Sequence, residues 1–142
     1  DPTDVEMLNE YYFETMHHEF AHILHQKKNY PTEYNQISAA DYSSTGWQNR
    51  TEQQAWKLGF VTPYAGMEPQ EDFVEVIANY LVKPDGFWEN MLANAGTEGA
   101  TKIQTKFDMV KEWLMTAWNI DIDELRTIII RRSGDIDSIL KK

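Results

Sequence analysis

The first 28 residues carry one helical pattern of apolar side chains, and this pattern constrains the fold more than any other feature of the sequence. The apolar residues recur at the three- and four-residue spacing of one helix face, and they are Val5, Leu8, Tyr12, Met16, Phe20, Ile23 and Leu24. Lys27 and Lys28 follow, and lysine is favourable at the negative end of a helix dipole. We therefore expect a long central helix from about Thr3 to Lys28.

Within this helix, the sequence His18-Glu19-x-x-His22 has the spacing of a zinc-hydrolase motif. Two histidines four residues apart lie one above the other on a helix face, so both imidazoles can reach one metal ion at about 2.0–2.1 Å. Glu19 can then lie over an attacking water without binding the metal. The alternative is a chance histidine cluster. The apolar neighbours Phe20, Ile23 and Leu24 favour the metal site, because they are expected to bury the ligand helix beside its metal.

The composition narrows the class of protein. The chain has 142 residues, of which 42% are hydrophobic and five are tryptophan, which argues for one ordered domain with a sizeable core. The formal charge of −10 disfavours nucleic acid as a partner, because a phosphate backbone requires a basic face. The chain has no cysteine, so any zinc site has to use histidine and carboxylate ligands. Its apolar runs are too short for a transmembrane segment.

The rest of the chain shows helical patterns and no convincing strand. Residues 29–46 lack periodicity and are rich in turn-forming residues. Their tyrosines, Tyr30, Tyr34 and Tyr42, either line a substrate cleft or cover the core. Pro69 occupies a position that is favoured at the start of a helix. The helices expected after the first one span 46 or 51 to 58, 69–82, 87–95, 98–118 and 122–132, with a short tail helix from residue 134. The expected fold class is mainly α.

A catalytic zinc site commonly has three protein ligands and an open position for water, so a third ligand has to be found. Glu71 and Glu75 lie four residues apart on one face of the helix expected over 69–82. One carboxylate can bind the metal while the other accepts the free ring N–H of a ligand histidine. The spacing does not decide which of them is the ligand. The alternative for this pair is a solvated acidic helix start, which the helix dipole favours.

Two other residues are candidates for the third ligand. His25 lies on the same face as His18 and His22, but three ligands from one straight helix fit a tetrahedral metal badly. We interpret His25 as a packing residue or as a support for a ligand, with coordination as the alternative. Asp72 points about 100° away from Glu71 around the helix, which disfavours it as a ligand.

With both motifs in view, the chain resembles the gluzincins, zinc peptidases with His-Glu-x-x-His on one helix and a ligand glutamate on a later helix. More narrowly, residues 18–26 and 71–75 resemble the zinc-binding metallopeptidases of Bacteroidetes, a family of substrate import-associated zinc metallohydrolase lipoproteins. The resemblance covers most of the first 82 residues. It implies that residues 1–142 form a zincin-like helical catalytic domain with one Zn²⁺, in the C-terminal part of a longer protein.

The resemblance also implies roles for individual residues. In related gluzincins the first glutamate of such a pair binds zinc and the acid four residues later holds a ligand histidine, which makes Glu71 the ligand and Glu75 the support. In some members a tyrosine seven residues before the ligand glutamate donates to the developing oxyanion, and Tyr64 has this offset. Zincin clefts commonly hold the peptide on an edge strand before the motif helix. Because residues 1–17 are expected to be helical, any small sheet is expected to come from an upstream segment.

The motifs and the resemblance together predict a zinc-dependent metallopeptidase that acts on peptide or protein substrates. Its metal ligands are expected to be His18, His22 and Glu71, and its catalytic residues Glu19 and Tyr64. The alternative is a non-catalytic or vestigial zinc-binding accessory domain of an outer-membrane nutrient-uptake system. The resemblance further implies outer-membrane uptake components as partners. It also implies a periplasmic or cell-surface location, as an outer-membrane lipoprotein anchored through an upstream segment.

Overall fold

The computed structural model describes residues 2–140, and the side chains of residues 14–135 and 138. Within residues 2–140 the chain forms helices and turns without a β-strand, so the expected mainly-α class is confirmed. The α-helices are α1 (Pro2–Lys27), α2 (Glu52–Lys57), α3 (Pro69–Val82), α4 (Phe87–Asn94), α5 (Gly96–Trp118) and α6 (Ile122–Leu140). The short 3₁₀ turns are η1 (Thr32–Gln36), η2 (Trp47–Asn49) and η3 (Tyr64–Gly66). None of the helices in the described part of the chain combines the length and the apolar character that a membrane crossing requires.

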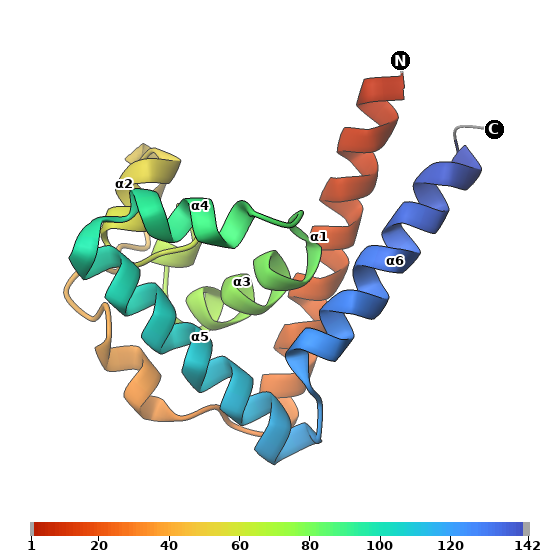
Figure 1. Cartoon of the computed structure of the whole chain (residues 1–142). Helices are drawn as coiled ribbons and strands as arrows, with labels where there is room; N and C mark the ends of the chain where they lie inside the picture. Colours follow the sequence, from red (N-terminus) through yellow and green to blue (C-terminus); the bar gives the residue numbers. More distant parts are fainter. Residues whose placement is uncertain (1, 141–142) are drawn as a thin grey trace.

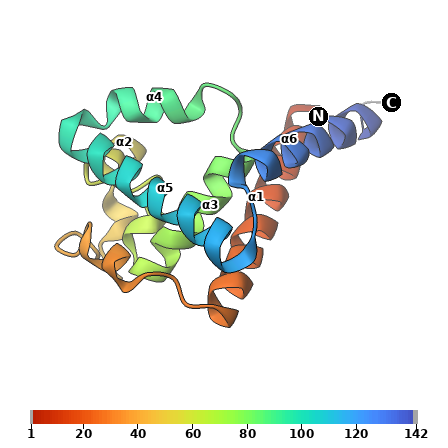
Figure 2. The ribbon, with the colours of Figure 1, turned by 60° about the horizontal axis from the view of Figure 1, so that its bottom comes forward.

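Helix α3 lies at the centre of the molecule, between α1 and α6 on one side and α2, α4 and α5 on the other (Figures 1 and 2). It contacts α1, α5, α6 and η3, and every residue from 72 to 79 is buried. The buried residues of α3 include polar ones: Asp72, Glu75 and Asn79. Buried polar groups have to find partners within the protein. Asp72 pairs with Lys106, and Glu75 bonds to His18 and Thr62, so these partners on other segments fix the orientation of α3. Asn79 donates to the backbone oxygen of Glu75 within the same helix.

The ends of α2 and α3 follow from local sequence signals. Thr51 caps α2: its Oγ1 accepts from the Gln54 N–H, and Gln54 Oε1 accepts from the Thr51 N–H, which is a reciprocal capping box. Pro69 is the first residue of α3, where a missing N–H costs no hydrogen bond. The helix ends at Val82. Lys83 precedes Pro84, and a residue before proline is disfavoured in helical conformation. The helix predicted over 69–82 is confirmed.

Two helix boundaries differ from the expected ones by more than one residue. Helix α5 begins at Gly96, two residues before the expected start; Gly96 has φ +72°, a conformation open to glycine at little cost. Helix α6 continues through Gly134 to Leu140, so the separate tail helix expected there is part of α6. One glycine inside a helix costs about 1 kcal/mol, which the helical residues on both sides of Gly134 offset.

A buried ion pair joins α3 to α5. Lys106 and Asp72 are both 0% exposed, and Lys106 Nζ lies 2.8 Å from Asp72 Oδ2. Nζ also donates to Ser38 Oγ and to the backbone oxygen of Gly59, at 2.9 and 2.7 Å. Each of the three ammonium protons thus has an acceptor, and a buried charge is tolerated when its hydrogen bonds are complete.

The tyrosines between α1 and α2 pack against the core. The hydroxyl of Tyr34 donates to Asp72 Oδ1, and that of Tyr42 donates to Asp72 Oδ2. Tyr30 stacks on Phe73, with ring centroids 4.4 Å apart. Of the two alternatives that the sequence left open for these tyrosines, core packing is therefore the one that the structure supports.

Helix α6 runs antiparallel to α1 along one side of the molecule (Figure 1), and polar contacts attach it to α3. The hydroxyl of Tyr80 donates to Asp123 Oδ1. Arg126 donates through Nε and Nη2 to the backbone oxygens of Tyr80 and Lys83, at 2.9 and 2.8 Å. These bonds satisfy carbonyl oxygens at the end of α3, which have no partner within that helix.

Candidate metal centre

Helix α1 presents two histidines toward α3. His18 and His22 lie one turn apart, and their ring centroids are 4.8 Å apart in an edge-to-face arrangement. Phe20, Ile23 and Leu24 were expected to bury this helix. The expectation is confirmed for Leu24, which is 7% exposed, and wrong for Phe20 and Ile23, which are 47% and 49% exposed because both lie on the face turned away from α3. Ala21 and Leu24 anchor the helix in the core.

Glu71, in the first turn of α3, completes a cluster with these histidines. Its Oε2 lies 3.0 Å from His18 Nε2, and its Oε1 lies 3.1 Å from His22 Nε2. Ligand atoms of the three residues all lie within 4.8 Å of one another. A tetrahedral zinc ion with bonds of about 2.0–2.1 Å separates its ligand atoms by roughly 3.3 Å. The two imidazoles and the carboxylate therefore fit zinc in both donor type and spacing.

The second ring nitrogen of each histidine faces a partner of its own. His18 Nδ1 lies 2.9 Å from Glu75 Oε2, and His22 Nδ1 lies 2.9 Å from His25 Nε2. A neutral imidazole that donates from Nδ1 keeps the lone pair of Nε2 free, which is the form that binds a metal. Both Nε2 atoms point at Glu71, so a metal ion at this position would meet the Nε2 lone pair of each histidine whose proton Glu75 or His25 holds on Nδ1.

This geometry distinguishes the residues between which spacing could not decide. Glu71 faces Nε2 of both histidines, whereas Glu75 reaches only the Nδ1 atom of His18. His25 lies behind His22 and is not part of the three-residue cluster. Asp72 points to the opposite side of α3, toward Lys106. The arrangement thus has Glu71 in the position of a ligand, with Glu75 and His25 as supports; their roles with bound metal stay predictions.

Burial and nearby charges shift the pKa values of His18 and His25 in opposite directions. Burial lowers the pKa of His18, but the hydrogen bond and charge of Glu75, with the charges of Glu71 and Glu19, outweigh it and raise that pKa above 6.5. For His25, burial and the neighbouring His22 lower the pKa below 6.5. His25 is therefore neutral at pH 7, as an acceptor of a hydrogen bond from His22 has to be.

Tyr64 and Glu19 flank the cluster. Tyr64 begins η3, and its ring centroid lies 5.8 Å from that of His18 and 5.1 Å from that of Trp47. Burial, together with the charge and hydrogen bond of Glu71, raises the pKa of Tyr64 to about 12. The phenol therefore keeps its proton at neutral pH. Glu19 follows His18 on α1 and its side chain is exposed.

Two residues that contribute to this region were not identified from the sequence. Thr62 Oγ1 donates to Glu75 Oε1 at 2.8 Å, although the two residues are separated by an irregular segment with two prolines. Lys106, from α5, pairs with Asp72, the residue that follows Glu71 in the sequence. Neither residue belongs to a local motif, and only the tertiary fold brings them to α3, so no sequence signal could have identified them.

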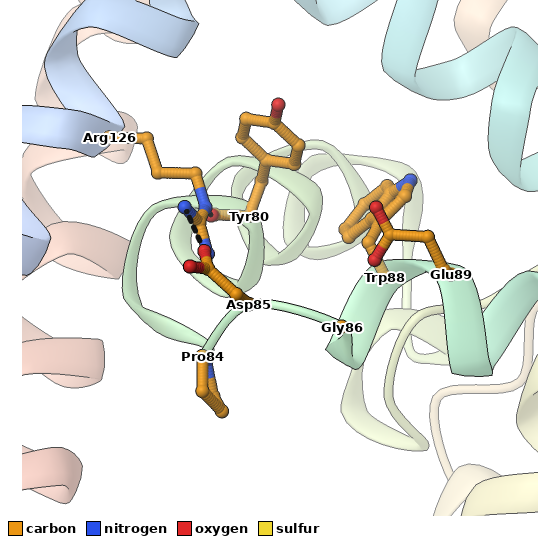
Figure 3. Close-up of a pocket in the computed structure, with 7 residues that line it drawn as sticks. All are labelled: Tyr80, Pro84, Asp85, Gly86, Trp88, Glu89 and Arg126. Carbon is orange, nitrogen blue, oxygen red and sulfur yellow. Dashed lines mark hydrogen bonds and ion pairs between the residues drawn. The ribbon is translucent and has the colours of Figure 1, made fainter.

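A separate hollow of about 220 Å³ lies near the end of α3, away from the histidines (Figure 3). Its lining residues are Tyr80, Pro84, Asp85, Gly86, Trp88, Glu89 and Arg126. Arg126 Nη1 pairs with Asp85 Oδ1 at 3.0 Å, and its other nitrogens donate to backbone oxygens. The guanidinium charge is therefore matched within the protein, and we assign no ligand to this hollow.

Comparisons with known proteins point to one family. The family described as "Putative zinc-binding metallo-peptidase" matches residues 1–123. The crystal structure of a "putative zinc-binding metallo-peptidase" from Bacteroides caccae is similar over 97% of this chain, with 52% sequence identity and a TM-score of 0.90. The similarity covers 53% of that protein's chain, so the present chain spans about half its length. No curated protein matches the chain.

Proposed function

Because the chain belongs to the family described as "Putative zinc-binding metallo-peptidase", we propose that it is a zinc-dependent metallopeptidase of the gluzincin type, which hydrolyses peptide bonds. One observation carries the proposal: Nε2 of His18 and Nε2 of His22 meet the carboxylate of Glu71 at 3.0 and 3.1 Å. These three residues would hold the ion and leave a fourth position open to water or substrate, as catalytic zinc sites do.

The residues around the cluster can divide the chemistry among them. A zinc ion in this site supplies a Lewis acid, which polarises the scissile carbonyl and acidifies a water molecule. Glu19 is the proposed general base: its carboxylate takes a proton from the attacking water and passes it to the leaving amine. Glu19 suits this role because it directly follows His18 on α1 and its side chain is open to solvent.

Tyr64 is the proposed oxyanion donor. Its pKa of about 12 keeps the hydroxyl protonated across the neutral range, and its ring lies beside that of His18. A hydrogen bond from Tyr64 to the tetrahedral oxyanion is expected to contribute about 3–4 kcal/mol to transition-state stabilisation. Glu75 and His25 keep His18 and His22 oriented and in the metal-binding tautomer.

The Glu19→Gln variant tests this proposal. The amide cannot accept a proton, so cleavage should fall by about 10²–10⁴-fold, while zinc affinity should stay at the wild-type value because Glu19 is not a ligand. Mass spectrometry of a digested peptide library, with and without a chelator, measures cleavage, and chelator competition measures zinc affinity. Glu112→Gln, the same change at an exposed position of α5, is the matched control and should cleave like the wild type.

The outcomes separate the proposal from its alternative. Cleavage at the wild-type rate by Glu19→Gln would refute the assignment of the general base. If the wild-type protein binds zinc and cleaves no peptide in the library, the non-catalytic accessory domain of an uptake system becomes the better hypothesis. Cleavage that a chelator abolishes would discard that alternative. The chain spans about half the length of its relative. That the whole protein acts on peptides is therefore also a part of this proposal.

A further inference from the structure

The hydroxyl of Thr62 lies between two parts of the candidate site. Oγ1 donates to Glu75 Oε1 at 2.8 Å, and it accepts from the backbone N–H of Ala65 at 3.1 Å. A threonine hydroxyl has one proton to donate and lone pairs to accept, so it makes both bonds at once. Thr62 is half-buried, and neither bond is part of a regular helix.

The first bond determines how Glu75 holds His18. Glu75 is 6% exposed, and its second oxygen, Oε2, lies 2.9 Å from His18 Nδ1. With Thr62 at one oxygen and His18 at the other, the carboxylate group has a fixed rotation. The direction of the His18 ring depends on that rotation, because the ring follows its hydrogen-bond partner.

The second bond determines where η3 begins. Ala65 is the middle residue of this turn, and Tyr64 is its first residue. Two bonds join η3 to the residues directly before it: the Ala65 N–H donates to Thr62 Oγ1, and the Gly66 N–H donates to the backbone oxygen of Pro63. Of the two, the bond to Thr62 is the one made by a side chain. Tyr64, which the proposed function assigns to the oxyanion, therefore takes its position from the same hydroxyl as Glu75.

We propose that Thr62 is a positioning residue, whose single hydroxyl fixes the carboxylate behind His18 and the turn that carries Tyr64 relative to each other. The inference rests on the proposed function for the role of Tyr64, whereas its zinc-binding part requires only that the cluster binds metal. Thr62 itself touches neither metal nor substrate. It acts through Glu75 on one side and through Ala65 on the other.

The test compares Thr62→Val, which removes both bonds, with Thr62→Ser, which keeps the hydroxyl. Thr62→Val should weaken zinc affinity about 10-fold, the lower end of the loss seen when a partner of a ligand is removed, and Thr62→Ser should restore wild-type affinity. Thr105→Val makes the same change on the exposed face of α5 and should bind zinc like the wild type. Chelator competition with Zn²⁺ alone gives the affinities, and circular dichroism of the metal-free variants confirms that each is folded.

Two further measurements test whether Thr62 acts through Glu75 on His18 and through Ala65 on Tyr64. In a Glu75→Ala background the loss caused by Thr62→Val should disappear, because the carboxylate that Thr62 holds is absent. In the metal-free protein the NMR signals of the Tyr64 ring should shift in Thr62→Val and stay in place in Thr62→Ser. The inference would be overturned if Thr62→Val weakened zinc affinity as much in the Glu75→Ala background as in the wild type. Unshifted Tyr64 signals in Thr62→Val would overturn it as well.

The outcome for Thr62 is distinguishable from the outcome for the proposed function. If the wild type cleaves peptides and Thr62→Val binds zinc as tightly as the wild type, only the inference about Thr62 is wrong. If the zinc and NMR results hold but no peptide is cleaved, Thr62 still positions the two groups, and the peptidase proposal is wrong.

Discussion

At the residue scale, the two ligand-type histidines have chemically different supports. Nδ1 of His18 faces the carboxylate of Glu75, whereas Nδ1 of His22 faces the neutral ring of His25. A carboxylate at position 25 would add a further negative charge to a site that already has Glu71 and Glu75 and the nearby Glu19. An imidazole there makes the hydrogen bond to His22 without adding that charge.

Replacing His25 by phenylalanine should therefore weaken zinc binding without changing the charge of the site. The phenyl ring keeps the aromatic contacts with Tyr30 and Phe73 but cannot accept from His22, so the affinity is expected to fall about 10-fold. Chelator competition measures the affinity. Tyr30→Phe, which keeps the ring next to His25 and loses only a hydroxyl bonded to Asn35, should bind zinc normally. Equal affinities for both variants would refute the supporting role of His25.

At the scale of elements, α3 uses neighbouring residues to contact opposite sides of the molecule. Glu71 and Glu75 face α1, whereas Asp72 faces α5 and the tyrosines of the loop. Asp72 directly follows Glu71, so the buried pair with Lys106 fixes the rotation of the first turn of α3. We infer that this pair sets the direction in which Glu71 points.

The Lys106→Met variant tests how strongly the pair anchors α3. Methionine keeps most of the apolar stem but leaves the carboxylate of Asp72 buried without a counter-charge. Removing one partner of a buried ion pair typically costs about 3–5 kcal/mol of unfolding free energy, which urea denaturation measures. Lys111→Met breaks an exposed pair with Asp123 and should change stability far less. A loss for Lys106→Met no larger than that for Lys111→Met would contradict the anchoring role.

The sequence predicts those parts of the site that depend on one helix at a time. The pairing of His18 with His22, and of Glu71 with Glu75, follows from helical spacing alone. The choice between Glu71 and Glu75 does not, because both lie on one face and only the position of α1 against α3 distinguishes them. Tyr64 and Thr62 lie in a segment with Pro63 and without periodicity, so their distance from α1 depends on the tertiary fold. Lys106 was unpredictable for the same reason, since its partner lies in another helix.

At the scale of the whole molecule, the cluster joins two helices that are far apart in the sequence. His22 on α1 and Glu71 on α3 are 49 residues apart, and both helices contribute to the core. In the metal-free protein, hydrogen bonds of the carboxylates to the histidines make this connection. An ion held by three ligands would add a link that exists only in the folded chain, because unfolding separates the ligands.

Zinc should accordingly stabilise the protein against unfolding, by an amount set by its free concentration. At free zinc about 100 times its dissociation constant, the unfolding free energy is expected to rise by about 2.7 kcal/mol. Urea unfolding in the presence of zinc or of a chelator measures the difference. Glu71→Gln loses a charged ligand but keeps the side-chain shape, so zinc should stabilise this variant much less. Stabilisation of Glu71→Gln equal to that of the wild type would mean that the ion binds elsewhere, and the assignment of this cluster as the zinc site would be wrong.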